Sequence, residues 1–136
     1  MGPDFEPIGG IETWQVSNPP ILAMAAVRAS LEIFAAAGME RLRKKSELLT
    51  GYLEWLVQQI PSGRISIITP KNPAERGCQL SLQIKNADKS LHDKITTAGV
   101  IADWREPDVI RVAPVPLYNK FEEVWRFSEI LKKCMA

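Results

Sequence analysis

The chain has 136 residues, of which 46% are hydrophobic and 24% charged, a composition typical of one globular domain with a modest core. Its 17 basic and 16 acidic side chains give a net charge of +1, so we expect it to bind neither nucleic acid nor an anionic membrane. The two cysteines, Cys78 and Cys134, are expected to be buried small side chains, and with a single histidine they predict no zinc site and no disulfide. The first ten residues have two acidic groups and no apolar run, which predicts no signal peptide and no membrane span, and a cytoplasmic location is expected.

Proline and glycine are frequent in residues 1–18, which predicts an irregular linker. A helix is expected from Pro19 or Pro20, because proline is tolerated in the first turn, to Gly38, which accepts the left-handed conformation of a helix end. Its larger apolar residues recur at spacings of three and four and share one face: Met24, Val27, Leu31 and Phe34. A second amphipathic helix is expected over residues 39–60, with its lysines in solvent.

After this helix the hydrophobic period changes from 3.6 to 2, which is typical of strands with one buried face. Strands are expected at residues 65–68, 77–84, 100–104 and 109–113, the last two joined as a hairpin through the turn "REPD". Asp88 is expected to cap a short helix that ends at Gly99, and Asn119 with Glu122 resembles the capping box of a final helix. The predicted fold is α+β, an antiparallel sheet of about four strands with helices on one face.

Arg111 is the most informative single residue. It lies in the strand "VIRVA", on the same face as Val109 and Ala113, so a permanent cation projects from an otherwise apolar strand. A guanidinium is costly to bury unless it is paired, and its planar fork suits a carboxylate held through two hydrogen bonds. The residues alone leave two interpretations open, an internal salt bridge and a clamp for a substrate carboxylate. The following segment "APVPLYN" is stiffened by its prolines, which would hold the arginine in one orientation.

Ser17 and Asn18 stand directly before the first predicted helix. Either side chain could cap that helix, or the helix N-terminus could bind an anion such as a phosphate with their help. Other motifs are missing: there is no P-loop, GxGxxG or GxSxG, and His92 is expected to be a solvated residue on a surface helix. The residues therefore contain no complete catalytic apparatus.

Four segments in the same order, "WQVSNPPI", "KSELLTGYLEWL", "IITP...ERGCQLSL" and "DVIRVAPVPLYNKFEEVWRF", resemble the C-terminal part of kynureninases, pyridoxal-phosphate enzymes of the aminotransferase-like fold. The resemblance implies a homodimeric hydrolase that cleaves L-kynurenine or 3-hydroxy-L-kynurenine to an anthranilate and L-alanine, on the route from tryptophan toward NAD. The resemblance implies that Arg111 binds the carboxylate of the substrate. It also implies that Asn18 lies in the cofactor pocket, near the phosphate and the substrate's aromatic ring, and that Ser17 lines the ring pocket beside it.

The resemblance also implies that residues 1–18 form an active-site wall continuous with a large domain, and that residues 19–136 form the small C-terminal domain. The Schiff-base lysine of the family and the aspartate at the pyridine nitrogen match nothing in this chain, so we expect it to be inactive alone. Two other hypotheses remain: a non-catalytic interaction module with the same fold, in which Arg111 would be paired internally, and a related pyridoxal-phosphate lyase, which would need a catalytic cysteine on a mobile loop. The enzyme hypothesis predicts instead that Arg111 and Asn18 share a concave side and that Arg111 has no internal acidic partner.

Overall fold

The computed structural model describes residues 4, 6–15 and 17–135. The chain forms two compact units, residues 1–36 and residues 37–136. The boundary predicted at residues 18 and 19 differs from this division, and the roles predicted on either side of it stay predictions. None of the described helices is by itself long and apolar enough to cross a membrane, although Ile21–Ala37 and Met39–Gln58 together have the length and composition for it.

The N-terminal unit holds a 3-10 turn, Ile11–Trp14, and the helix α1, Ile21–Ala37, whose last residue already belongs to the second unit. The predicted end at Gly38 is confirmed, and the helix begins at Ile21, one residue after the predicted Pro20. The carbonyl of Pro20 accepts a hydrogen bond from the N–H of Met24, and Gly38 beyond the end has a φ of 81°, a conformation that costs glycine little.

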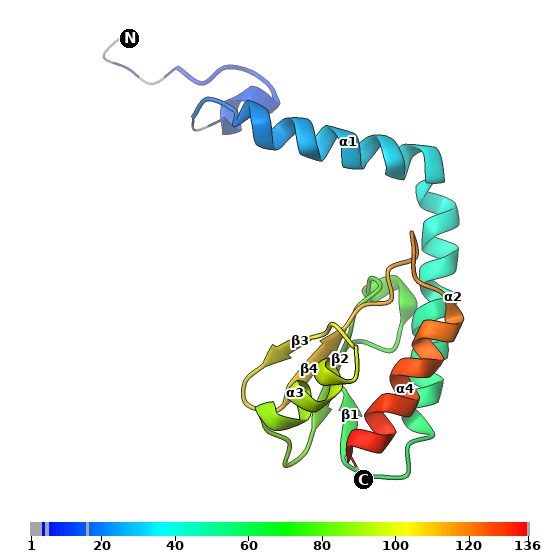
Figure 1. Cartoon of the computed structure of the whole chain (residues 1–136). Coiled ribbons are helices and arrows are strands. Elements are labelled where there is room, and N and C mark those ends of the chain that lie inside the picture. Colours follow the sequence, from blue (N-terminus) through cyan, green and yellow to red (C-terminus); the bar gives the residue numbers. More distant parts are fainter. Residues whose placement is uncertain (1–3, 5, 16, 136) are drawn as a thin grey trace. The chain divides into compact units, whose positions relative to one another are not determined.

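The described part of the C-terminal unit contains three α-helices, a short 3-10 helix at Pro73–Glu75 and four strands (Figure 1). The helices are α2, Met39–Gln58, α3, Lys89–Thr97, and α4, Phe121–Met135. The strands are β1, Ile65–Ile67, β2, Leu80–Ile84, β3, Asp103–Arg105, and β4, Val109–Val112. They form one sheet in the order β1-β2-β4-β3, and every neighbouring pair is antiparallel. The predicted α+β fold is confirmed.

The core lies between one face of this sheet and the helices. Alternate residues of β2 and β4 point into it, and α2 and α4 lie side by side over it (Figure 1). The buried cluster consists of Leu49, Leu53, Val57, Leu80, Leu82, Ile84, Leu91, Ile95, Ile110, Val112, Val124, Phe127 and Leu131. Because successive strand residues face opposite sides, the residues between these positions form a second, polar face, which carries Ser66, Ser81, Gln83 and Arg111.

Capping side chains mark where α3 and α4 begin. Asp88 caps α3 by accepting a hydrogen bond from the N–H of Ser90 at 2.8 Å, as predicted, and Gly99 beyond the helix has a φ of 91°. The predicted capping box of α4 is displaced by one residue. The carboxylate of Glu123, not that of Glu122, accepts the N–H of Lys120 at 2.8 Å, because α4 begins at Phe121 and Glu123 is therefore its third residue.

Candidate functional site

Arg111 lies in β4 on the polar face of the sheet, with β2 on one side and β3 on the other. The register places it directly opposite Ser81 of β2 and Asp103 of β3. The inward-pointing neighbours Ile110 and Val112 are buried and hold the strand against the core. The alternation of the strand therefore holds the guanidinium on the open face, with its side chain 33% exposed.

Asp103 is the acidic partner of this guanidinium. One of its oxygens, Oδ2, accepts a hydrogen bond from Nε of Arg111 and forms an ion pair with Nη2 of the same side chain. The same oxygen accepts a hydrogen bond from Nε of Arg105 at 3.0 Å. These contacts lower the pKa of the Asp103 carboxyl below its usual value, chiefly through the hydrogen bond from Arg111 and secondarily through Arg105. The expectation that Arg111 has no internal acidic partner is wrong, because hairpin pairing brings an aspartate opposite it.

The geometry of this pair leaves part of the guanidinium available. Asp103 occupies the edge formed by Nε and Nη2, and within the described part of the chain Nη1 makes no hydrogen bond. A guanidinium has five N–H donors in a fixed plane, so the second edge, formed by Nη1 and Nη2, can still receive a carboxylate through two parallel bonds. An internal salt bridge and a carboxylate clamp are thus compatible at this residue.

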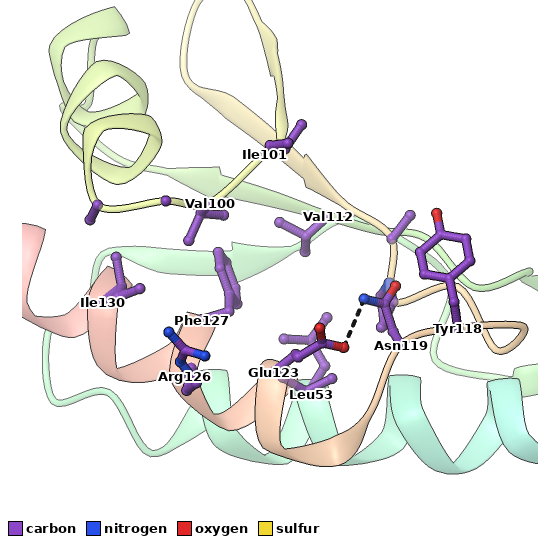
Figure 2. Close-up of a pocket in the computed structure, with 15 residues that line it drawn as sticks. Leu53, Val100, Ile101, Val112, Tyr118, Asn119, Glu123, Arg126, Phe127 and Ile130 are labelled. Atoms are coloured by element: carbon purple, nitrogen blue, oxygen red, sulfur yellow. Dashed lines mark hydrogen bonds between the residues drawn. The ribbon is translucent and has the colours of Figure 1, made fainter.

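The segment that leaves β4 is held by its own hydrogen bonds. The side-chain oxygen of Asn119 accepts the N–H of Val115 at 2.7 Å, and the N–H of Asn119 donates to the Val115 carbonyl at 2.9 Å. The side-chain amide of Asn119 also donates to Glu123 at 3.1 Å (Figure 2). This network connects the strand that carries Arg111 to the first turn of α4, which supports the predicted stiffness of the exit.

A hollow of about 540 Å³ lies beside this exit, between the link after α3 and the N-terminal half of α4 (Figure 2). Its apolar wall includes Val100, Val112 and Phe127, and Glu123 and Arg126 contribute charge. Val112 points to the helix side of the sheet, whereas Arg111 points to the open side, so this hollow is separate from the arginine. No local sequence pattern predicts this hollow, because its walls come from segments far apart in the chain.

Ser17 and Asn18 lie in the N-terminal unit, and both are exposed. Together with Ile8, Glu12 and Gln15 they line an open hollow of about 570 Å³. The prediction that one of them caps α1 is wrong, because the helix begins at Ile21 and two prolines separate it from Asn18. Arg111 belongs to the other unit, and the prediction that it shares a concave side with Asn18 stays a prediction.

Three further expectations need correction. His92 is not a solvated residue, because its side chain is only 17% exposed and its Nε2 lies 3.1 Å from the carbonyl oxygen of Ala102. Cys78 and Cys134 are half-buried, not buried, and Cys78 precedes β2 rather than lying in it. Every lysine of the chain is exposed or half-buried, and Lys45 is half-buried rather than solvated. Covalent attachment of pyridoxal phosphate requires an enclosed lysine, and none of these lysines is enclosed.

Comparison with known proteins places these residues in context. The model of a family described as "Kynureninase C-terminal domain" matches residues 42–131. The kynureninase of Koribacter versatilis is 53% identical over 129 residues, which cover 95% of this chain and 30% of the relative. The kynureninase of Myxococcus xanthus is 52% identical over 132 residues, 97% of this chain and 31% of the relative, and that of Xanthomonas euvesicatoria is also 52% identical over 132 residues. The chain thus spans about 30% of the length of the curated relatives it matches.

Proposed function

Because this chain belongs to the kynureninase family, we propose that it corresponds to the C-terminal part of a hydrolase that cleaves L-kynurenine, its 3-hydroxy form or both to the corresponding anthranilate and L-alanine. The observation that carries the proposal is the similarity over 95% of the chain, which includes the strand of Arg111 and the segment of Asn18. In this proposal the complete enzyme is a cytoplasmic homodimer that acts in tryptophan catabolism.

In this proposal Arg111 binds the carboxylate of the amino-acid substrate. The edge formed by Nη1 and Nη2 faces the substrate, while Asp103 holds the other edge and prevents the guanidinium from rotating. Two parallel hydrogen bonds define the plane of the carboxylate and so orient the atoms attached to it. The network of Asn119 would keep the strand in place while the substrate binds.

The proposed cofactor of the complete enzyme is pyridoxal phosphate, which when bound supplies an electron sink for breaking the bond between Cβ and Cγ of the substrate. The exposed and half-buried lysines of this chain do not suit covalent attachment of the cofactor. We therefore assign the lysine that attaches it to the part of the enzyme outside this chain. For Ser17 and Asn18 we propose a place on the wall near the phosphate and the substrate's ring. The free N–H groups of α1 begin at Ile21, after two prolines that carry none, and such groups suit an anion.

A test of this proposal uses a chimera in which this chain replaces the matched third of the Myxococcus xanthus kynureninase. Release of anthranilate from L-kynurenine, and of its 3-hydroxy analogue from 3-hydroxykynurenine, is followed by fluorescence. We expect the chimera to be active and Arg111→Ala to lower kcat/KM by about 100-fold or more, since two charge-assisted hydrogen bonds are lost.

Arg105→Ala is the matched control, because Arg105 contacts the same oxygen of Asp103 but lies two residues further along β3, opposite Val109 rather than Arg111. Its kcat/KM should stay within about threefold of the unaltered chimera. An inactive chimera that folds, or an Arg111→Ala variant as active as the control, would contradict the proposal.

The second candidate is a non-catalytic interaction module with the same fold. The ion pair of Arg111 and Asp103 favours it, since this hypothesis predicts an arginine paired within the domain. The two candidates are separated by the same chimera, because a module that has lost its catalytic role would leave a folded chimera without anthranilate release.

A further inference from the structure

Ser81 lies beside Arg111 on the polar face of the sheet. The register of β2 and β4 places the two residues directly opposite each other. The N–H of Ile84 donates to the carbonyl of Asp108 at 2.9 Å, so these two residues form a hydrogen-bonded pair of the same ladder. Hydrogen-bonded and non-hydrogen-bonded pairs alternate, and Ser81 with Arg111, three positions along, is therefore a non-hydrogen-bonded pair. The side chains of such a pair are closer together than those of a hydrogen-bonded pair.

The place of Ser81 is fixed by its main chain. Its N–H donates to Oγ1 of Thr69 at 2.8 Å, and its carbonyl accepts the N–H of Ile68 at 3.0 Å. The side-chain hydroxyl accepts a hydrogen bond from the amide of Gln79 at 3.4 Å, and among the described residues it donates to no group. A serine hydroxyl has one donor, so this donor is open on the face that carries Arg111.

The open donor of Arg111 lies on the same side of the arginine. The three nitrogens of a guanidinium surround its central carbon in one plane, so Nη1 points away from the edge of Nε and Nη2 that Asp103 occupies. Asp103 belongs to β3, and Ser81 belongs to β2 on the other side of β4. Asp103 also contacts two arginines and neutralises the charge of only one. The open side of Arg111 therefore combines a positive charge with a neighbouring hydroxyl, which suits an anion.

We propose that Ser81 binds the substrate together with Arg111, and that its hydroxyl donates a hydrogen bond to the carboxylate held by the free edge of the guanidinium. A carboxylate has about four acceptor positions on its two oxygens, so two bonds from an arginine leave room for a third donor. A carboxamide in the same place would present an amide N–H₂ group, which cannot accept a hydrogen bond, to one of these donors. The proposal rests on the proposed function and deepens it, because it names a second residue that selects a free carboxylate.

A purely structural role of Ser81 makes a different prediction. Its side-chain hydrogen bond with Gln79 is long and Gln79 is exposed, so the loss of this bond should change the free energy of unfolding little. The main-chain bonds of Ser81 do not depend on its side chain. We therefore expect Ser81→Ala to leave the Tm unchanged, so that a change in substrate binding reports the missing hydroxyl itself.

The first test replaces Ser81 with alanine in the chimera with the Myxococcus xanthus enzyme. We expect KM for L-kynurenine to rise about tenfold and kcat to change less than about twofold, because the lost bond holds the carboxylate and not the reacting atoms. Ser81→Thr keeps the hydroxyl and should restore most of the affinity. The matched control is Ser66→Ala, which removes a hydroxyl from the same face but on the edge strand β1, opposite Gln83, and should leave KM unchanged.

A double substitution shows whether the two residues hold the same group. Without Arg111 the carboxylate is no longer held in reach of the hydroxyl, so Ser81→Ala should lower kcat/KM less than about threefold in the Arg111→Ala background, against about tenfold in the unaltered chimera. Equal losses in both backgrounds would overturn the proposal, since Ser81 would then act independently of the carboxylate that Arg111 holds.

Binding of L-alanine, measured by isothermal titration calorimetry, needs no turnover. L-Alanine has the carboxylate of the substrate without its ring, so its Kd should rise about tenfold in Ser81→Ala and stay the same in Ser66→Ala. L-Alaninamide should bind the unaltered chimera at least about tenfold more weakly than L-alanine, and Ser81→Ala should reduce this difference.

The proposal is overturned if Ser81→Ala and Ser66→Ala have the same KM and Kd, if Ser81→Thr restores nothing, or if the folded chimera does not bind L-alanine. The proposed function is judged separately. If Arg111→Ala lowers kcat/KM and Ser81→Ala does not, the proposed function stands and the role of Ser81 fails. If the chimera releases no anthranilate but both substitutions weaken the binding of L-alanine, the carboxylate contact stands and the proposed reaction fails.

Discussion

Arg111 and Asp103 meet because of the register of a hairpin. The turn between β3 and β4 places the aspartate directly opposite the arginine, and both side chains lie on the face of the sheet that the helices do not cover. A carboxylate that binds one edge of a guanidinium fixes the direction of the other edge. In the proposed enzyme Asp103 is therefore a positioning residue, which acts on the substrate through Arg111.

Replacing Asp103 with asparagine tests this role in the active chimera. The neutral amide lacks the negative charge that pairs with the guanidinium, so the guanidinium is less well oriented, and we expect KM for L-kynurenine to rise about tenfold. The effect on kcat should be much smaller, because no atom of Asp103 meets the reacting bond. Steady-state kinetics measures KM and kcat separately, and Asp103→Glu should restore part of the affinity. Unchanged KM in Asp103→Asn would show that the pair does not position the arginine.

At the scale of elements, the exit of β4 and the start of α4 form one unit. Asn119 closes the turn after the strand, and Glu123 receives both the side-chain amide of Asn119 and the N–H of Lys120. The pKa of the Glu123 carboxyl is lowered, first by the hydrogen bond from the Lys120 N–H and then by that from Asn119. The ionised form of Glu123 therefore stabilises the fold.

The pH dependence of this cap gives a second prediction. Because the pKa of Glu123 is lower in the folded state, its contribution is fully present above the ordinary value of 4.5 and is lost as the pH falls through the lower, folded-state value. We expect Glu123→Gln to lower the Tm of the isolated chain at pH 7, and the difference from the unaltered chain to shrink in acid. Glu122→Gln, one position earlier and without a hydrogen bond in the described chain, is the control. Scanning calorimetry from pH 3 to pH 7 measures the Tm of both variants. The same Tm at every pH for Glu123→Gln and Glu122→Gln would contradict the capping role of Glu123.

For the whole molecule, the exposed helix α1 has a consequence in solution. In the isolated chain its apolar faces are open to water, and their burial by any available surface is favourable. We therefore expect the isolated chain to associate as its concentration rises, without a fixed stoichiometry. Light scattering over a concentration series measures this, and Val27→Glu with Leu31→Glu should reduce the association. A constant monomer mass at high concentration would contradict the expectation.

Much of the secondary structure could be predicted locally. The change of hydrophobic period after α2 separates helices from strands, and Gly38, Asp88 and Gly99 mark helix ends. Where prediction failed, the decisive contacts were not local. The half-burial of His92 depends on packing of α3 against the link to β3, where the carbonyl oxygen of Ala102 lies 3.1 Å from its Nε2.

The sequence by itself determined the family, the order of the elements, the two-layer α+β fold and the face of β4 on which Arg111 lies, because periodicity, caps and turns depend on residues close together in the chain. Only the tertiary structure decided that Asp103 holds one edge of this arginine, that Glu123 caps α4, and that α1 buries no residue. These three facts depend on strand register, on the residue at which a helix begins and on which surfaces pack together. Strand register and packing join parts of the chain that patterns of neighbouring residues do not relate, and the start of a helix can shift by one residue between two equally suitable positions.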